Sequence, residues 1–314
     1  MASLNSYSKD LSHFWKGEIL WNRPMSHYST LKVGGPAEAI VSVKNIEELK
    51  QLIGWLREND INWWVVGRGS NILVSDHGLS GVVIVLEDKF TSIEILAEQE
   101  CQKDKSILIR TGGGCLLSKA VHFCTANSLS GLEFAVGIPG SIGGAVVMNA
   151  GAWGHEIGNL VDSVTLMDNN GKIFIEQGKN LAFTYRSWGV KSNAILLYAN
   201  LTLINGSSGE IKASCLRFQE LRKKKQPLSK ASAGSFFKNP PDLSAGRLID
   251  EAGLKGHAIG GAKISEKHAN FIVNTGNASA TEIFALMHLV QDTVHKKFGI
   301  RLEPEVRILG EKGY

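Results

Sequence analysis

The chain has 314 residues, a length that predicts two or three domains and leaves ample room for buried cores. Hydrophobic residues make up 43% and charged residues 20%, an ordinary globular mixture, and the net charge of +4 is too small to indicate nucleic-acid binding. No apolar run approaches the roughly 18 residues of a membrane span, and the first residues lack the apolar core of an export signal. We therefore expect a cytoplasmic protein that binds neither nucleic acid nor membrane.

The spacing of the cysteines argues against a metal site and against a catalytic thiol. They show no C-x-x-C spacing and no nearby histidine at the spacing of metal ligands. We therefore expect no metal site, and we interpret the thiols as reduced, buried and structural rather than catalytic. The residues concerned are Cys101, Cys115, Cys124 and Cys215.

The first elements in chain order predict a βαβ unit. Gly35-Pro36 marks a turn, and an apolar strand follows at residues 39–43. Asn45 and Glu48 have the spacing of a capping box, and the helix that they open has one apolar face. A second strand follows at residues 63–66, so this part of the chain favours an α/β arrangement.

The second strand runs into a glycine-rich turn in which backbone amides can converge on an anion. It is not a Rossmann fingerprint, because position 72 holds isoleucine, and the chain has no Gly-Lys-Ser/Thr of a P-loop. Taken alone, an ordinary strand connection explains it equally well. The turn consists of Gly67, Arg68, Gly69, Ser70 and Asn71.

Residues 88–106 are rich in charged and amide side chains, and we interpret them as a polar connector after a domain boundary near Leu86. A short strand at 107–109 and a helix with an apolar face around Leu117 and Cys124 follow. Further on, residues 161–167 and 172–176 alternate like two strands of a hairpin, and residues 194–204 predict a longer strand.

The stretch Gly131–Gly158 is the densest in glycine and contains no lysine or arginine. A glycine-rich turn that opens a helix forms an anion site from backbone N–H groups and the helix dipole, and such a site needs no basic side chain. A purely structural turn would need only one or two glycines. The expected contacts are Gly137, Ile138, Pro139, Gly140, Ser141, Gly143, Gly144 and Ala145.

A third segment begins after the basic run Arg222–Lys225, which ends a helix just before Pro227. This run usually faces water, but it could also neutralise a diphosphate. Two more helices follow, and the second is opened by the capping pair Ser279 and Glu282.

Several residues outside the glycine-rich turns could carry chemistry. Arg186 beside Tyr185 can hold a carboxylate, although a surface arginine over an aromatic ring is the commoner case. Gly234 allows Ser235 to be presented from a tight backbone, and the context is not a nucleophile elbow, so this serine could donate a proton. Lys238 and Asn239 suit a phosphate or a sugar, and a simple turn is an equally good explanation.

The C-terminal residues 301–308 alternate like a strand. Glu303, Glu305 and Arg307 share one face, which usually means a solvated edge, although such a face can also border a cleft. His268 precedes an apolar strand, and we interpret it as structural because it lacks a metal partner at ligand spacing.

Taken together, these motifs resemble the UDP-N-acetylenolpyruvoylglucosamine reductase family, which makes UDP-N-acetylmuramate for peptidoglycan. Seven motifs in family order are far more specific than any one of them. They are Thr30–Ala37, Gly67–Asn71, Gly137–Ala145, Asn149–Ala152, Tyr185–Ser187, Gly234–Pro240 and Leu302–Val306.

The resemblance implies a mixed α/β and α+β chain: a two-subdomain FAD-binding fold of the PCMH type with a third, α+β, substrate-binding domain. We expect the first subdomain at residues 1–86, with 300–314 returning to it, the second at 87–219 and the substrate-binding domain at 220–299. FAD would be held non-covalently, its pyrophosphate at the two glycine-rich turns.

The resemblance also implies the chemistry. NADPH is the co-substrate that reduces the flavin, and the enolpyruvyl UDP-sugar then takes the hydride. By motif match Ser235 resembles the proton donor, while Arg186 and Glu305 resemble the groups that stabilise the enolate-like intermediate. Tyr185, Lys225, Lys238, Asn239 and His268 fall where the family contacts substrate. We expect the chain to act as a monomer.

The chain resembles the shorter, second subtype of the family, because no tyrosine lies between Pro241 and Ala252. Two other functions compete with this one. A different flavoenzyme of the same fold would act on an alcohol or a hydroxy acid, and many of those attach flavin through a histidine that both turns here lack. A catalytically inactive nucleotide-binding regulator would not need Arg186, Ser235 and Glu305 together.

Overall fold

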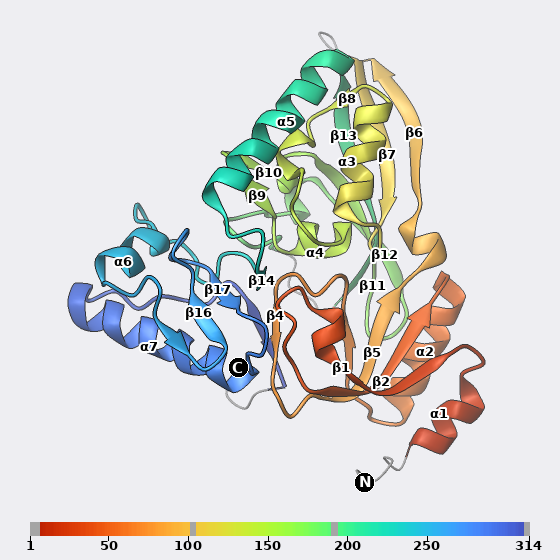
Figure 1. The fold of residues 1–314 in the computed structure, drawn as a ribbon. Coiled ribbons are helices and arrows are strands. Elements are labelled where there is room, and N and C mark those ends of the chain that lie inside the picture. The colour runs from red at the N-terminus through yellow and green to blue at the C-terminus, as the bar shows by residue number, and fades with distance from the viewer. Residues whose placement is uncertain (1–6, 101–104, 190–193, 311–314) are drawn as a thin grey trace. The chain divides into compact units, whose positions relative to one another are not determined.

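The computed structural model describes residues 7–100, 105–189 and 194–310 (Figure 1). The chain divides into two compact units. Unit 1 contains Met1–Ile19, Ile40–Gly67 and Val83–Leu221, and unit 2 contains Leu20–Ala39, Arg68–Val82 and Arg222–Tyr314. Cys101 lies outside the described residues.

The largest sheet belongs to unit 1 and has the strand order β12-β11-β13-β7-β6, with β8 paired to β13. All its recorded pairings are antiparallel. The strands are β6 (Ile93–Glu100), β7 (Lys105–Gly112), β8 (Leu129–Ser130), β11 (Val161–Met167), β12 (Ile173–Gln177) and β13 (Ile195–Asn205).

One hydrophobic core packs helices against this sheet (Figure 1). It contains the apolar faces of α3 (Leu117–Ala126) and α4 (Ile142–Val147) and, from α5 (Ser208–Lys225), Phe218. Cys115 and Cys124 are buried and Cys215 is partly buried, and burial raises the pKa of all three thiols, that of Cys124 to about 12. These thiols therefore stay protonated and unreactive near neutral pH, as expected from the sequence.

A second sheet has the order β1-β2-β5-β3. Its strands are β1 (Ile19–Pro24), β2 (Pro36–Val43), β3 (Trp63–Val65) and β5 (Leu79–Leu86). Between β2 and β3 the chain forms α2 (Ile46–Glu58), which Asn45 caps by accepting the Glu48 N–H. The predicted strand-helix-strand unit is therefore present, with β5 between its two strands.

Unit 2 has its own core under a sheet of order β14-β17-β16-β15. The strands are β14 (Ala231–Ser232), β15 (Ala258–Ile259), β16 (Ala262–Ile264) and β17 (Ile272–Asn274), and the helices are α6 (Ala245–Glu251) and α7 (Ala280–Phe298). The predicted capping box of Ser279 and Glu282 opens α7, and Gly299 ends it in the left-handed conformation. Shorter elements are α1 (Ser8–Phe14), β9 (Gly151–Ala152) and β10 (His155–Glu156).

Two predictions about strands were wrong. The polar connector at 88–106 contains the edge strand β6. A register irregularity between Ile95 and Ala97 interrupts its alternation, and Ile95 and Leu96 are both exposed. Of residues 301–310, only β18 (Arg307–Leu309) is a regular strand, and it pairs in parallel with β4 (Ile72–Val74). Pro304 forms only an isolated bridge to Phe237, because the Phe236 N–H that a longer ladder needs donates to the Asn270 carbonyl instead. The three-domain division remains a prediction.

A second cap fixes the start of α7 within unit 2. The Asp76 carboxylate accepts the Ala280 N–H, the Thr281 N–H and the Thr281 hydroxyl, each at 2.8 Å. Burial opposes ionisation of Asp76, but these hydrogen bonds prevail and hold its pKa below the ordinary value. The ionised carboxylate therefore stabilises the fold fully at pH values above the pKa that Asp76 has in the unfolded chain. This stabilisation is lost as the pH falls through the lower pKa that Asp76 has in the folded protein.

We expect Asp76→Ala to lower the free energy of unfolding by roughly 1 kcal/mol at neutral pH, because a carboxylate at a helix N-terminus is lost. Urea denaturation measures the difference. The difference in unfolding free energy between the variant and the unaltered protein should disappear in acid, where Asp76 is protonated. Asp292→Ala, at an exposed position of the same helix, is the control, and an equal loss in both variants would contradict the assignment.

Candidate functional site

The first glycine-rich turn, Gly67–Asn71, connects β3 to β4. A Cβ on Gly69 would lie less than 3.0 Å from the Tyr28 carbonyl oxygen, and its φ of +58° also favours glycine. Thr30 N–H donates to the Gly69 oxygen at 3.1 Å, and Arg307 N–H donates to the Asn71 oxygen at 3.0 Å. Among the described residues no acceptor is recorded for the five N–H groups of this turn. The carbonyls thus hold the turn, and the N–H groups remain for a ligand.

The second turn leads from Gly137 into α4. Gly137 and Gly140 have φ of +73° and +146°, and Ser141 caps α4 by accepting the Gly144 N–H at 3.3 Å. Ile142 and Gly143 donate their N–H groups to the carbonyl oxygens of Cys115 and Gly113, both at 2.8 Å. Within the described chain, the N–H groups of Gly140 and Ser141 have no recorded acceptor. The donors left for an anion therefore precede α4 rather than lie in its first turn.

The start of the first turn approaches the second turn within unit 1. A Cβ on Gly67 would lie less than 3.0 Å from the Ser141 hydroxyl oxygen. Within unit 1 the unused N–H groups of Gly67, Gly140 and Ser141 lie on two segments with only the small Ser141 side chain against Gly67, and such donors can bind the diphosphate of a dinucleotide. The residues of unit 1 that would hold it therefore fit such a group.

Tyr185 and Arg186 form the tip of a tight turn in unit 1. Thr184 and Ser187 exchange backbone hydrogen bonds of 2.8 and 3.0 Å across it. Arg186 has a φ of +60°, unusual for arginine, and its guanidinium carbon lies 5.0 Å from the centre of the Tyr185 ring. A strained backbone of this kind often marks a functional turn. The predicted neighbours Tyr185 and Arg186 are thus stacked on each other, and Tyr185 is exposed.

Asn149, a residue to which the sequence assigned no role, anchors this turn. Its side-chain nitrogen donates to the Thr184 carbonyl at 3.0 Å and to Glu156 at 2.8 Å, and its oxygen accepts the Gly158 N–H at 3.0 Å. Asn149 is only 1% exposed and lies two residues after the end of α4. The helix after the second glycine-rich turn is thereby tied to the turn that carries Arg186.

Ser235 and Glu305 lie on two segments of unit 2 that pair backbone to backbone. Glu305 N–H donates to the Phe236 carbonyl at 2.8 Å, and Lys238 N–H donates to the Glu303 carbonyl at 2.9 Å. Asn71 of the first turn adds a hydrogen bond from its side-chain nitrogen to the Glu305 carbonyl at 3.1 Å. Three separate predictions, the first turn, Ser235 and Glu305, therefore meet within unit 2.

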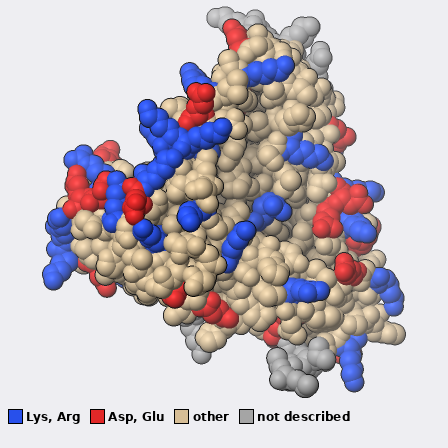
Figure 2. Space-filling model, in the orientation of Figure 1, with Lys and Arg blue, Asp and Glu red and all other residues tan. Residues whose placement is uncertain are grey.

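The predicted substrate residues of unit 2 differ in their surroundings. Lys238 forms a 3.2 Å ion pair with Glu303, and the pair is weak because the Glu303 side chain is largely exposed and that of Lys238 is partly exposed. The Asn239 side-chain oxygen accepts the Ala245 N–H at 3.0 Å at the start of α6. Lys225 is exposed at the end of α5, where Figure 2 shows Lys and Arg side chains gathered.

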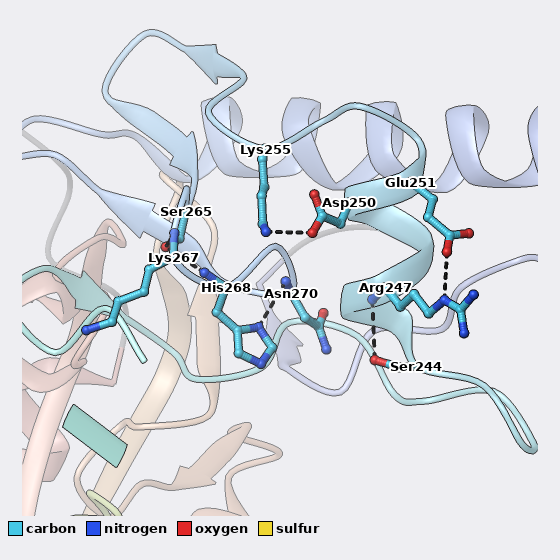
Figure 3. A network of polar contacts seen from close by, with 9 residues as sticks. All are labelled: Ser244, Arg247, Asp250, Glu251, Lys255, Ser265, Lys267, His268 and Asn270. Atoms are coloured by element: carbon cyan, nitrogen blue, oxygen red, sulfur yellow. Dashed lines mark hydrogen bonds and ion pairs between the residues drawn. The ribbon is translucent and has the colours of Figure 1, made fainter. Parts of the chain in front are cut away.

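His268 is partly buried, and Figure 3 shows it between Lys267 and Asn270. Desolvation, and to a lesser extent the charges of Lys255 and Lys225, hold its pKa below the ordinary value. Its Nδ1 accepts the Asn270 N–H at 3.3 Å, which leaves the proton of the neutral ring on Nε2. His268 is therefore a neutral donor near neutral pH. The described residues contain no cluster of His, Cys, Asp and Glu able to hold a metal ion.

Comparison with known proteins decides the family. Residues 37–175 match the FAD binding domain, and residues 226–309 match the C-terminal domain of UDP-N-acetylenolpyruvoylglucosamine reductase. The reductase of Clostridioides difficile is 41% identical, over 99% of this chain and all of its own, and that of Caldanaerobacter subterraneus is 41% identical over 95% of each chain. This chain belongs to the UDP-N-acetylenolpyruvoylglucosamine reductase family.

A solved relative confirms the predicted fold. The crystal structure of UDP-N-acetylenolpyruvylglucosamine reductase from Thermus caldophilus has 35% identity and a TM-score of 0.78, and it covers 93% of this chain and 98% of its own. The prediction of a two-subdomain FAD-binding fold, of an oxidoreductase and of FAD as cofactor is confirmed. No helix within the described ranges is long and apolar enough to cross a membrane.

Gly67→Ala should weaken FAD binding about tenfold, equivalent to about 1.4 kcal/mol, because the added methyl group collides with the Ser141 hydroxyl and separates the two turns. Flavin titration of the deflavinated protein measures the effect. Gly54→Ala, in α2 with no atom within 4 Å of the added Cβ, should leave FAD affinity unchanged. Equal affinities in the two variants would show that the turns do not need this close approach.

Proposed function

We propose that this chain reduces the enolpyruvyl group of UDP-N-acetylglucosamine enolpyruvate to UDP-N-acetylmuramate in peptidoglycan synthesis. Family membership supports the reaction, and the backbone pairing of the Ser235 segment with the Glu305 segment is the observation that carries the assignment of residues. The chemistry that bound FAD supplies is hydride transfer, from NADPH to the flavin and then to the methylene carbon of the substrate.

The residues of the chain must then stabilise the negative charge that develops on the substrate and supply the proton that completes the reduction. Hydride addition to the methylene carbon places negative charge on the substrate carboxylate side, and Arg186 offsets it with a fixed positive charge. Glu305 contributes if its carboxyl holds a proton, because only the protonated form donates a hydrogen bond. Ser235 gives its hydroxyl proton to the adjacent carbon. Groups of this kind are often worth about 3 kcal/mol each in a transition state.

The remaining residues bind the UDP-sugar. Lys225 and Lys238 supply positive charge for phosphate oxygens, and the weak ion pair of Lys238 with Glu303 costs little to exchange for a substrate contact. His268 donates from Nε2, and Tyr185 presents its ring and hydroxyl at the exposed turn. Asn239 offers its amide to the sugar, and its side-chain oxygen accepts the Ala245 N–H at the start of α6.

The wider setting follows from the same assignment. We propose the shorter family subtype, non-covalent FAD, a cytoplasmic location and a monomer that binds neither nucleic acid nor membrane. The residues proposed to bind FAD are Gly67–Asn71 with Gly137–Ser141 and Gly143–Ala145, within subdomains 1–86 and 87–219, and residues 220–299 form the substrate-binding domain.

The purified protein should oxidise NADPH only when UDP-N-acetylglucosamine enolpyruvate is present. The absorbance of NADPH measures the rate, and mass spectrometry identifies UDP-N-acetylmuramate as the product. Simple alcohols and 2-hydroxy acids serve as control substrates, because another flavoenzyme of this fold would use them. Equal rates with these compounds would refute the proposed substrate.

Ser235→Ala should leave flavin reduction by NADPH nearly unchanged and slow reoxidation by the UDP-sugar by on the order of a thousandfold, because the proton donor is lost. Stopped-flow absorbance of the flavin separates the two steps. Ser232→Ala is the matched control, because the Ser232 backbone carbonyl, not its hydroxyl, accepts the recorded bond from Thr30. Unchanged reoxidation in Ser235→Ala would remove this serine from the reaction.

A further inference from the structure

Asn270 is a buried amide that grips the segment carrying Ser235. Its side-chain oxygen accepts the Phe237 N–H at 2.9 Å, and its side-chain nitrogen donates to the Phe237 carbonyl at 2.8 Å. Its backbone oxygen also accepts the Phe236 N–H at 2.7 Å. With 3% of its surface exposed, Asn270 makes these bonds away from water. The side chain thus pairs with the backbone of Phe237 as a neighbouring strand would.

The opposite edge of the same segment pairs with the residues around Glu305. The Phe236 carbonyl accepts the Glu305 N–H, and Phe237 bridges to Pro304. Phe236 and Phe237 are therefore held from two sides, by Asn270 and by residues 303–305. Loss of the Asn270 side chain would leave the N–H and carbonyl of Phe237 without these partners, while the backbone bond from the Phe236 N–H to the Asn270 carbonyl would remain.

Gly234 and Ser235, the two residues before Phe236, have few recorded contacts that fix them. Gly234 has a φ of +81°, and a Cβ there would meet nothing within 4 Å. No backbone hydrogen bond of Ser235 is recorded among the described residues. Ser235 is therefore held by the two residues that follow it, Phe236 and Phe237, and through Phe237 by the Asn270 side chain.

Asn270 also fixes the ring of His268. Its backbone N–H donates to Nδ1 at 3.3 Å (Figure 3). The centre of the His268 ring lies 4.9 Å from that of the Phe271 ring, and the ring borders Gly246. Because Nδ1 accepts, Nε2 carries the proton and is the atom that can donate. One asparagine therefore reaches two residues that the proposed function uses.

We propose that Asn270 is a positioning residue for substrate reduction, whose side-chain amide holds the Ser235 segment in place through Phe237. The inference rests on the proposed function. Misplacement of a reacting group by about 1 Å can cost on the order of a hundredfold in rate. Loss of the amide should therefore slow the step that needs the proton and spare flavin reduction by NADPH.

Asn274 provides the matched control for a merely structural role. It lies at the end of β17 in the same unit, is 5% exposed, and donates to the carbonyls of Leu31 and Lys32 at 3.1 and 3.3 Å. Its oxygen accepts the N–H groups of Gly276 and Ala278 at 2.8 and 3.1 Å. Its side chain makes at least as many hydrogen bonds as that of Asn270, but none to the Ser235 segment or to His268.

The experiment compares Asn270→Ala and Asn274→Ala as flavin-loaded proteins by stopped-flow absorbance. Both variants should melt at a lower temperature than the unaltered protein, and both should be reduced by NADPH at nearly the unaltered rate. Only Asn270→Ala should slow reoxidation at saturating UDP-N-acetylglucosamine enolpyruvate, by on the order of a hundredfold, with an increased solvent deuterium isotope effect. Asn270→Asp keeps an acceptor for the Phe237 N–H, so its reoxidation rate should lie between those of the unaltered protein and Asn270→Ala. If the alanine variant does not fold, the comparison is made with Asn270→Asp.

The outcomes separate the two proposals. If the unaltered protein is not reoxidised by the UDP-sugar, the proposed function fails before any variant is compared. If the unaltered protein reacts but Asn270→Ala and Asn274→Ala lose reoxidation rate equally, or neither loses it, Asn270 is structural and the inference is overturned. A selective loss in the Asn270 variants, with the larger isotope effect, supports it.

Discussion

The close approach of backbones around Gly112–Gly114 is the constraint on which the second glycine-rich turn depends. A Cβ on any of these three glycines would lie less than 3.0 Å from the carbonyl oxygen of Phe90, Leu196 or Leu86, respectively. The segment then engages the turn with three hydrogen bonds, from Gly143 to Gly113, from Ile142 to Cys115, and from Leu117 to Gly140. Side chains at these positions would push the segment outward, and the turn that begins α4 would lose these three hydrogen bonds.

Close backbone contacts of this kind explain several of the glycines in both turns. Some glycines serve the protein itself: Gly143 faces the Gly113 oxygen, and Gly69 faces the Tyr28 oxygen. Gly144, in contrast, is exposed, and a Cβ there would meet only the Ser141 hydroxyl, at 3.6 Å. The anion-binding capacity of the turns lies in the N–H groups that remain once these internal contacts are made.

Buried asparagines do a related task at the two candidate catalytic turns. Asn149 holds the turn with Arg186, and Asn270 holds the segment with Ser235. An amide side chain carries both a donor and an acceptor, so it can satisfy a peptide unit that no strand reaches. Removing it leaves buried peptide groups unsatisfied, at a cost of about 1–3 kcal/mol for each group. Both turns can therefore stay irregular and yet be precisely held.

The predictions that succeeded rest on local chemistry. The hairpin of β11 and β12 follows from alternation around Asp168-Asn-Asn-Gly171, and its register pairs Met167 with Ile173. The capping box of α7 follows from the spacing of Ser279 and Glu282. Strand β6 was missed because an edge strand with exposed apolar side chains carries no local periodicity.

The sequence by itself determined the glycine-rich turns, the inventory of reactive side chains and, through motifs in order, the family. Only the tertiary structure decided which N–H groups of the turns are already used, and that the Ser235 segment pairs with Glu305 on one edge and with Asn270 on the other. The reason is that a backbone hydrogen bond between distant segments depends on how the whole core packs. No spacing within either segment encodes its partner.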